Sequence, residues 1–454
     1  MSPSVKIALI APGREEEFAV QEPLNLGILA AYLEKNKIQV KIIDQLAGQN
    51  VYQELEKFSP QIVGITATTP VVVRAYKIAD FCRKNKILTV MGGVHASVLP
   101  EKALEHADIV VKGEGEAAIL KIIEQNIRSG IIQAPFIKDL DEIPPPARHL
   151  MQMEFYLRTK DRIQESYLYF VPLHSRTAAM LVSRGCPYRC AFCHNTWRGL
   201  PFRFHSPKRV ISEIKALKKN YGITHLFFID DNLFINKLWL EEICRLMIKN
   251  NVDVIWGCNA RVDNLDLQTL QIMRRAGCRQ LTFGFESGSQ RILDILKKGT
   301  TVKQNKNAIE FCKRAGLLAT GTFMIGNPTE TIRDIRLTQQ FIKENDIDNY
   351  GICLTTPYPG TELWQWCERE GLIPPNFKWS DFTFRQIPIQ VCRDISKKEL
   401  SKLYYQTAYL IKPRKGPILL KRVVKNIFKH PFKIFFRFLK HPSRISNILK
   451  RLKI

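Results

Sequence analysis

The sequence contains no run of 18 or more apolar residues, which excludes a typical transmembrane helix. Its first residues, MSPSVKIALIAPG, lack the longer apolar segment and the small-residue cleavage site of a secretory signal peptide. Acidic residues are absent from positions 401–454, where 15 Lys and Arg residues occur. From the first two absences we expect a cytoplasmic protein.

The positive charge is concentrated near the end of the chain, because these 15 charges belong to a net charge of +25. Three segments there alternate apolar and basic residues and are separated by His-Pro pairs at 430–431 and 441–442, a pattern typical of amphipathic helices in membrane interfaces. We therefore expect a peripheral position on the inner face of the membrane; packing on the protein itself or on a partner is the alternative. No basic helix with interleaved aromatic residues occurs elsewhere, which disfavours a nucleic-acid-binding protein with a structural metal centre.

The order of the patterns predicts an α/β protein with two folded domains. Strand-like and helix-like segments alternate from 1 to 130, which indicates a doubly wound, Rossmann-like parallel sheet. The segment LDEIPPPARHL breaks this rhythm, so we expect a linker at 131–170. Six further strand candidates predict a partial (β/α)6 barrel at 171–385, with its chemistry at the carboxyl ends of the strands. A basic helical region at 386–454 completes the chain.

Cysteine is sparse enough to be informative, with 11 residues in a chain of 454. A reducing compartment disfavours disulfides, and eight of the 11 stand singly among apolar neighbours, as ordinary buried thiols do. The other three, Cys186, Cys190 and Cys193, lie in RGCPYRCAFCHN. No second CxxC pair follows at zinc-finger distance, although His194 leaves a Cys₃His zinc site as an alternative. Three thiolates on a four-iron cluster would leave one iron open for chemistry.

The segment CPYRCAFC, with the aromatic Phe192 before its last cysteine, resembles the signature of the radical S-adenosylmethionine (SAM) superfamily. This resemblance implies that Cys186, Cys190 and Cys193 hold a [4Fe–4S] cluster whose open iron binds the amino and carboxylate groups of SAM. An electron from the reduced cluster would then cleave SAM to methionine and a 5′-deoxyadenosyl radical. A reductant such as flavodoxin or ferredoxin is implied as a partner.

Motifs at the later strand ends, FIDDN, CNARVD, FGFESGS and TFMIGNPTET, resemble the SAM-binding segments of the same superfamily. A sulfonium and a ribose require carboxylates and open backbone nearby, which these motifs offer. The SAM-binding residues that the resemblance implies are Phe192, Asp231, Asn259, Arg261, Gly284, Glu286, Ser287, Met324, Gly326 and Pro328. The alternative for each is an ordinary strand-end turn or helix cap, and it applies most to Asp231 and Ser287.

The first turn of the N-terminal domain, APGREEEF, lacks the GxGxxG motif of dinucleotide-binding domains, and no DxHxxG motif of cobalamin mutases occurs. Instead QEPLNLG, TATT, GGVH and GEGE follow one another in an order that resembles the N-terminal domain of cobalamin-dependent radical SAM enzymes. The cobalamin-binding residues implied are Gln21, Pro23, Leu24, Asn25, Thr66, Thr68, Thr69, Gly92, Gly93, Val94, His95, Gly113, Glu114, Gly115 and Glu116. His95 would contact the corrin edge or, as an alternative, bond to cobalt as the lower axial ligand. Some superfamily members retain this domain without using cobalamin.

The resemblance implies a radical C-methyltransferase, similar to hopanoid methylases, that acts on an unactivated carbon through a 5′-deoxyadenosyl radical and methylcobalamin. Its small-molecule substrate would be hydrophobic, such as a lipid, a tetrapyrrole or another natural product, and the basic tail favours a membrane-resident one. The alternative is oxidative ring closure or rearrangement with the same cofactors, as in the anaerobic magnesium-protoporphyrin ester cyclases. Side chains alone do not abstract hydrogen from such a carbon, so the cofactors carry this step, and no catalytic side chain is predicted.

Overall fold

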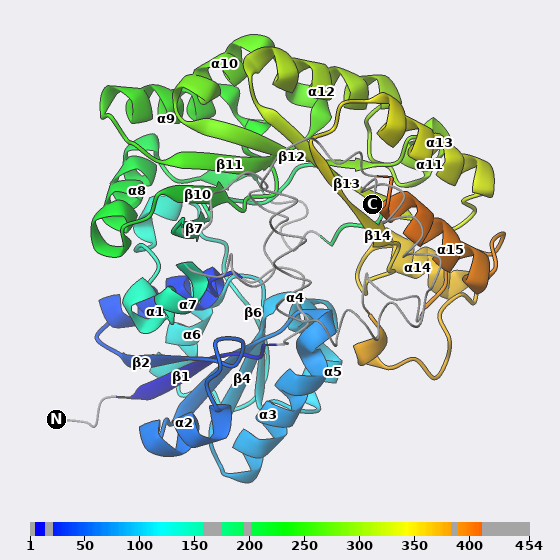
Figure 1. Ribbon diagram of the computed structural model, residues 1–454. Coiled ribbons are helices and arrows are strands. Elements are labelled where there is room, and N and C mark those ends of the chain that lie inside the picture. Colours follow the sequence, from blue (N-terminus) through cyan, green and yellow to red (C-terminus); the bar gives the residue numbers. More distant parts are fainter. Residues whose placement is uncertain (1–4, 14–20, 158–174, 195–200, 383–388, 411–454) are drawn as a thin grey trace, which may run out of the picture. The chain divides into compact units, whose positions relative to one another are not determined.

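The computed structural model describes residues 5–13, 21–157, 175–194, 201–382 and 389–410, and those up to Tyr409 belong to one compact unit (Figure 1). The basic tail at 411–454 lies outside the described residues, so its amphipathic helices stay a prediction. Among the helices that are described, none combines the length and the apolarity that crossing a bilayer requires.

The N-terminal domain is a six-stranded parallel sheet in the order β2-β1-β3-β4-β5-β6. Its strands are β1 (Lys6–Ala11), β2 (Gln39–Asp44), β3 (Ile62–Thr66), β4 (Leu88–Gly92), β5 (Ile109–Lys112) and β6 (Gly130–Gln133). Its helices are α1 (Leu24–Lys35), α2 (Val51–Phe58), η1 (Thr69–Val71), α3 (Val72–Lys84), α4 (Gly93–Val98), α5 (Pro100–Leu104) and α6 (Gly115–Glu124). The strand order reverses between β1 and β3, and ligands of open parallel sheets bind beside such a point.

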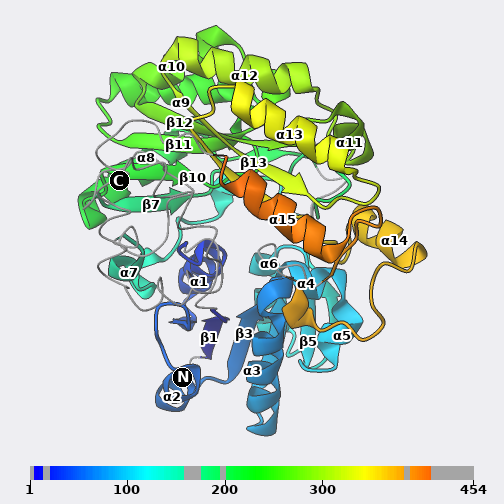
Figure 2. The same cartoon turned by 45° about the vertical axis from the view of Figure 1, so that its right-hand side comes forward.

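Helices cover both faces of this sheet, which explains why the strands are apolar along most of their length. Helix α1 contacts α6 on one face, whereas α2, α3 and α5 pack on the other around a core of buried aliphatic side chains (Figures 1 and 2). The doubly wound domain predicted from the alternation is therefore confirmed.

The connection to the second domain is partly ordered and packs against both domains. It contains η2 (Leu140–Glu142), η3 (Arg148–Leu150) and α7 (Met153–Leu157). The Tyr156 hydroxyl of α7 hydrogen-bonds to the carboxylate of Asp44 at the end of β2. Strand β6 runs across the boundary expected at residue 130, so this limit falls inside the sheet; the other domain limits stay a prediction.

The second domain is an open six-stranded parallel sheet in the order β14-β13-β12-β11-β10-β7, with an outer layer of helices (Figure 1). Its strands are β7 (Thr177–Met180), β10 (His225–Phe228), β11 (Ile255–Ala260), β12 (Cys278–Glu286), β13 (Leu318–Ile325) and β14 (Asn349–Leu354). Its helices are α8 (Pro207–Tyr221), η5 (Leu233–Ile235), α9 (Lys237–Lys249), η6 (Val262–Asn264), α10 (Leu267–Arg275), α11 (Gln290–Ile295), α12 (Val302–Ala315), α13 (Ile332–Glu344) and α14 (Glu362–Arg369). Because β7 and β14 both lie at edges, the sheet is a partial barrel, as predicted.

Local sequence signals fix several of these helix ends. Helices α12 and α13 begin with capping boxes at Thr301 and Thr331, in which side chain and backbone satisfy each other's free hydrogen-bonding groups. Helix α12 ends at Gly316 in the left-handed conformation that favours glycine. Because all pairings in this sheet are parallel, the carboxyl ends of its strands, and the motifs that follow them, lie at the same edge.

In the described part of the chain, side chains rather than another strand cover the outer edge of β7. The Glu22 carboxylate accepts a hydrogen bond from the backbone N–H of Ala179 at 3.0 Å, and Arg148 donates to the Ala179 carbonyl at 3.0 Å. Arg148 also forms a buried ion pair with Glu213 of α8 at 2.7 Å. Burial raises the pKa of Glu22, and the nearby charge of Arg148 opposes this shift. The N-terminal domain and the connection thereby supply hydrogen-bond partners for the backbone groups of Ala179 at this free edge.

The end of the described chain packs on both domains. Helix α15 (Lys397–Ala408) covers β13 and β14, where Leu400 and Leu403 join an apolar cluster around Ile325. The short η7 (Trp379–Asp381) carries Trp379 against His95 of the N-terminal domain, at a ring distance of 5.0 Å. The boundary expected at residue 385 lies outside the described residues and stays a prediction.

Candidate functional site

The cysteine loop follows β7 and is held at its start by a buried carboxylate. Asp230, just beyond β10, accepts hydrogen bonds from the backbone N–H groups of Val182 at 3.0 Å and Ser183 at 2.6 Å, and from the Ser183 hydroxyl at 2.5 Å. Burial raises the pKa of Asp230 to about 7, although these hydrogen bonds oppose the shift. Asp230 thus fixes the chain at β8 (Ser183–Arg184), directly before Cys186.

The three cysteines lie on one short turn. Cys190 is buried, Cys186 is half-buried and Cys193 is exposed. The turn is held from two sides, because the Ala191 N–H donates to the Leu296 carbonyl and the Ala191 carbonyl accepts from the Leu363 N–H, each at 2.8 Å. Surrounding protein and the charge of Asp231 raise the pKa of the Cys193 thiol to about 12, and the same two effects raise that of Cys186.

Arg261, at the end of β11, lies beneath this turn. Its guanidinium stacks over the Tyr188 ring at 3.5 Å, and one nitrogen lies 3.6 Å from the Cys190 sulfur. Its other nitrogens donate to Asp263 and to the Lys298 carbonyl, at 2.8 and 2.7 Å. The sequence predicted that the Arg261 guanidinium binds SAM. In this structure its N–H groups contact protein groups instead, so Arg261 supports the cysteine turn.

Glu286 at the end of β12 forms a buried ion pair with Lys298, at 2.8 Å. The pair lies against Gly284, where an added Cβ would come within 2.3 Å of the Glu286 carboxylate and 2.9 Å of the Lys298 ammonium. Glu286 itself adopts a positive φ of 59°, a strained conformation for a residue with a side chain. The Lys298 ammonium lies 5.7 Å from the centre of the Phe192 ring, so the pair borders the cysteine turn.

Two of the predicted SAM ligands are engaged in local structure. The Ser287 hydroxyl shares a hydrogen bond with Thr338 at 3.1 Å and accepts another from the Ser289 N–H, and the side chain is fully buried. The Asn259 amide donates to the Asp230 carbonyl at 3.1 Å. Both arrangements match the strand-end turn that the sequence left open as an alternative. Asp231, in contrast, is exposed beside the cysteines.

The segment after β13 is shaped by a carboxylate that the sequence did not single out. Glu330 is fully buried, and one of its oxygens accepts from the N–H groups of Gly326 at 2.6 Å and Asn327 at 2.9 Å. Burial raises the pKa of Glu330 to about 7. Met324 is half-buried and Pro328 is buried in the same turn. Glu330 therefore fixes the backbone at Gly326 and Asn327, the segment that we predicted to lie beside the adenine of SAM.

A cavity of about 250 Å³ opens at the carboxyl edge of the N-terminal sheet, and its walls are mostly aliphatic. Nine of the predicted cobalamin residues line it: Asn25, Thr66, Gly92, Gly93, Val94, Gly113, Glu114, Gly115 and Glu116. The Asn25 amide donates to the Thr66 hydroxyl at 3.1 Å, which joins two of the predicted loops. The other six predicted residues, Gln21, Pro23, Leu24, Thr68, Thr69 and His95, are not among its lining residues.

His95 is buried beneath these loops and has no open ring nitrogen. Nδ1 lies 3.0 Å from the Thr69 hydroxyl and Nε2 lies 3.1 Å from the Tyr76 hydroxyl. Burial lowers the pKa of His95 to about 4, so the ring is neutral at physiological pH. A bond to cobalt would require breaking one of these buried hydrogen bonds. In this structure His95 supports the loops above it, and the axial-ligand alternative would require the ring to leave one of these two partners.

Two glutamates of the GEGE motif are also engaged in an unexpected way. Glu114 pairs with Arg203 of β9 (Arg203–Phe204) at 2.7 Å, and Glu116 pairs with Arg184 of β8. Burial raises the pKa of Glu114. Hydrogen bonding from Arg203 and the charge of Arg184 lower this pKa by more than burial raises it, so the net shift is downward. These carboxylates therefore line the cavity while bonded to the second domain, rather than facing a ligand as free groups.

Known families match both halves of this architecture. A model described as the radical SAM superfamily matches residues 180–342, and one described as a B12 binding domain matches residues 19–123. An uncharacterized methyltransferase from Pyrococcus horikoshii is 31% identical in an alignment that covers 94% of this chain and 95% of that protein. This chain belongs to the cobalamin-dependent radical SAM superfamily.

Other members differ in the reaction that their names describe. The anaerobic magnesium-protoporphyrin IX monomethyl ester cyclase of Rubrivivax gelatinosus is 29% identical over 76% of this chain and 66% of its own length. Further relatives are named as methyltransferases of a cytidylyl phosphonate, a bacteriochlorophyllide and hopanoids. Among solved structures, the cobalamin-dependent radical enzyme OxsB with aqua-cobalamin and SAM bound has a TM-score of 0.70 at 16% identity, covering all of this chain and 76% of its own. At that identity the likeness shows the fold.

The residues present fit the cofactors of this superfamily. Three cysteine thiols on one turn supply the donor set of a cluster with one open iron. Among the described residues, no three His, Cys, Asp or Glu side chains converge on a position for a single ion. The aliphatic cavity suits the apolar ring of a corrinoid's nucleotide tail, and the glycines at its mouth admit a flat macrocycle close to the backbone.

Sequence reasoning missed the partners of several site residues in this enzyme. Five residues hold the predicted residues in place: Lys298, Asp230, Glu330, Arg184 and Arg203. Asp230, Glu330 and Arg184 stand within the quoted motifs, yet none of the five was predicted as a ligand. The sequence indicated Lys298 and Arg184 only weakly: a buried carboxylate such as Glu286 or Glu116 requires some cation nearby. The partner's identity depends on the fold and cannot be read from spacing.

Gly93 provides a test of the cavity mouth. Its φ is +87°, and an added Cβ would come within 2.7 Å of the Thr66 hydroxyl and 3.1 Å of the Ala67 backbone. We expect Gly93→Ala to lower the free energy of unfolding by about 2–3 kcal/mol and to abolish hydroxocobalamin binding, because strain and overlap add. Gly48, with a φ of +93° and nothing within 4 Å, is the matched control. Gly48→Ala should cost only about 1 kcal/mol in chemical denaturation and should leave cobalamin binding intact.

Proposed function

We propose that this chain is a cobalamin-dependent radical SAM C-methyltransferase that acts on an unactivated carbon of a hydrophobic small molecule. The observation that carries the proposal is a shared wall: Leu181 and Arg184, which lead into the cysteine turn, also line the cavity of the B12 binding domain. This shared wall supports the proposal, because transfer of a methyl group to a substrate radical requires the two cofactor sites to be neighbours.

The protein groups have separable roles in this proposal. Cys186, Cys190 and Cys193 would hold three irons and leave the fourth for SAM, and Arg261 supports their turn from below. The Glu286–Lys298 pair would meet the polar end of SAM, and the Gly326 backbone held by Glu330 would flank its adenine. When bound, the cluster supplies the electron that cleaves SAM, and cobalamin supplies the methyl carrier.

Methyl transfer to cobalamin tests the proposal without knowledge of the substrate. The protein, reconstituted anaerobically with iron, sulfide and hydroxocobalamin, is incubated with dithionite and SAM that carries a CD₃ group. We expect 5′-deoxyadenosine together with a CD₃-labelled corrinoid in mass spectra. Release of 5′-deoxyadenosine with an unlabelled corrinoid would instead support the second candidate, an oxidative cyclase, which the similarity to the magnesium-protoporphyrin enzyme favours. Absence of both products would contradict either reaction.

We further propose that the basic tail brings the enzyme to a membrane-resident substrate. The support is its composition: 15 Lys and Arg and no acidic residue in 401–454, with apolar stripes between them. Removal of residues 413–454 should abolish co-sedimentation with vesicles containing phosphatidylserine and leave the behaviour toward neutral vesicles unchanged. Equal sedimentation of the two proteins with the anionic vesicles would refute this role.

A further inference from the structure

The stem of the cysteine turn is a small two-stranded antiparallel pair, and its two arginines face a single motif of the other domain. Strands β8 and β9 pair with Arg184 opposite Arg203. Cys186 follows Arg184 by two residues, and the other two cysteines lie between the two strands in sequence. Whatever fixes Arg184 and Arg203 therefore fixes both ends of the segment that carries the three thiols.

Four buried charged side chains meet at this stem. Glu114 accepts from two nitrogens of Arg203, at 2.7 and 3.2 Å, and lies 3.3 Å from Arg184, while Glu116 pairs with Arg184. The side chains of Arg184 and Arg203 are 9% and 6% exposed, and those of Glu114 and Glu116 are 4% and 6% exposed. Two cations on adjacent strands repel each other unless anions lie between them, and burial strengthens this dependence.

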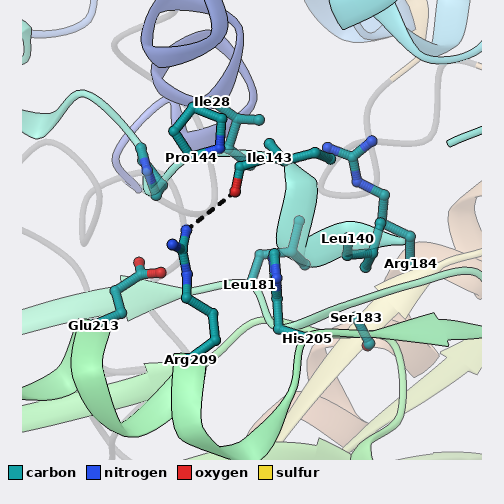
Figure 3. A pocket seen from close by; sticks show the side chains of 11 residues that line it. Ile28, Leu140, Ile143, Pro144, Leu181, Ser183, Arg184, His205, Arg209 and Glu213 are labelled. Atoms are coloured by element: carbon teal, nitrogen blue, oxygen red, sulfur yellow. Dashed lines mark hydrogen bonds between the residues drawn. The ribbon is translucent and has the colours of Figure 1, made fainter. Parts of the chain in front are cut away.

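The same motif is tied to the start of the connection and lines the cavity. The Ile137 N–H donates to Glu114 at 3.0 Å, and the Arg203 guanidinium lies 4.1 Å from the centre of the Phe136 ring. Glu114, Glu116 and Arg184 all line the B12 cavity. Figure 3 shows a pocket that Ser183 and Arg184 line together with residues of the connection, and there Arg209 donates to the Ile143 carbonyl at 3.3 Å. The stem thus lies among residues from the N-terminal domain, the connection and the barrel.

We propose that the GEGE motif is a clamp on the stem of the cysteine turn, with Glu114 and Glu116 as positioning residues that set where the turn lies relative to the B12 cavity. The motif acts through Arg184 and Arg203 and needs no contact with cobalamin to do so. The clamp itself stands on the contacts just described; its consequence for the alignment of the two cofactors rests on the proposed function.

Hydrogen exchange in the cofactor-free protein tests the clamp directly. In Glu116→Gln we expect amide exchange in peptides from 182–194 and 203–206 to be about 10-fold faster than in the unchanged protein, because an uncompensated buried arginine favours opening. Glu54→Gln, which breaks a half-buried ion pair with Lys41 in the same domain, is the matched control and should leave those peptides unchanged. Unchanged exchange at the stem in Glu116→Gln, or faster exchange spread evenly over the N-terminal domain, would overturn the clamp.

Two further variants keep the test decisive if Glu116→Gln fails to fold. Glu116→Asp retains the charge and shortens the side chain, and should give a smaller rise confined to the same peptides. The double variant Glu116→Gln/Arg184→Gln removes both charges together, so its stem should exchange more slowly than that of Glu116→Gln. A double variant that exchanges as fast as or faster than Glu116→Gln would show that the pair does not act as a unit and would reject the proposal.

Loaded protein tests the consequence for alignment separately. Pulsed electron paramagnetic resonance of the reduced cluster and cob(II)alamin in one sample reports the distance between their spins. We expect a single narrow distance distribution in the unchanged protein and a broader one in Glu116→Asp, at equal iron and cobalamin content. Identical distributions would show that the clamp does not set the alignment. Failure of the unchanged protein to hold either cofactor would instead count against the proposed function, while the exchange result still decides the clamp.

Discussion

Changing Cys186, Cys190 or Cys193 to Ala, one at a time, is expected to abolish both the iron–sulfur cluster and the cleavage of SAM. Each cysteine would hold one iron, and a cluster with two remaining thiolates loses a second coordination site to solvent. Anaerobically reconstituted protein should contain about four irons per chain, and each variant should fall to background. Release of 5′-deoxyadenosine with dithionite and SAM should disappear in the same variants.

A buried thiol outside the turn is the control for this loss. Cys82 lies in α3 of the B12 binding domain and is fully buried, so Cys82→Ala removes one sulfur and leaves the turn unchanged. Its cost should be about 1 kcal/mol of folding free energy, with full iron content. Retention of a SAM-cleaving cluster in any of the three turn variants would refute the assignment of that cysteine.

Asp230→Ala should remove the cluster without touching a ligand. The substitution leaves the N–H groups of Val182 and Ser183 and the Ser183 hydroxyl without an acceptor in a buried position. We expect a loss of about 3–5 kcal/mol in folding free energy, together with strongly reduced iron content. Asp230→Asn retains an oxygen at the position that accepts the three shortest hydrogen bonds, so it should fold and load with iron.

The Asp230→Asn variant also gives a pH dependence with a defined sign. Burial raises the pKa of Asp230 to about 7, from an ordinary value of 3.8, so the folded protein holds this proton more tightly than the unfolded chain. The contribution of Asp230 to stability is therefore complete below about pH 4, is lost as the pH rises to about 7, and is level above that. The amide that Asp230→Asn introduces does not titrate in this range.

Chemical denaturation of Asp230→Asn and the unchanged protein at several pH values measures this effect. The stability of the variant relative to the unchanged protein should rise between about pH 4 and 7, by at most about 1.4 kcal/mol per pH unit. Glu330, whose pKa burial also raises to about 7, is present in both proteins and cancels in the comparison. A difference that does not vary with pH would contradict a buried carboxyl group with a raised pKa.

The sequence predicted the fold class and located the cysteine turn well, because both depend on local patterns. Strands such as Lys6–Ala11 are apolar where helices cover both faces, and the CxxxCxxC spacing lies within eight residues. The roles of single polar residues were harder to predict. Arg261 and Ser287 stand at strand ends, as ligands do, yet their hydrogen bonds go to the protein.

The remaining gaps concern contacts between residues that are far apart in the chain. Glu114 and Arg203 are separated by 89 positions and Glu116 and Arg184 by 68, and spacing carries no information about such pairs. His95 shows a related limit: its place in a GGVH loop suggested a surface near cobalamin, whereas Thr69 and Tyr76 occupy both ring nitrogens beneath that surface. A motif predicts where a loop is, and the packing around it decides which way each side chain faces.

The covering of β7 by Glu22 and Arg148 has a consequence for how such enzymes are assembled and inherited. A barrel produced without the N-terminal domain and the connection would leave the backbone of Ala179 at an open edge and Glu213 without its counter-ion. Such a fragment would recruit a strand from another copy and precipitate. The two halves are therefore not interchangeable modules. We expect a barrel to fold with a different N-terminal half, in evolution or in the laboratory, only when Glu22, Arg148 and Glu213 are all retained.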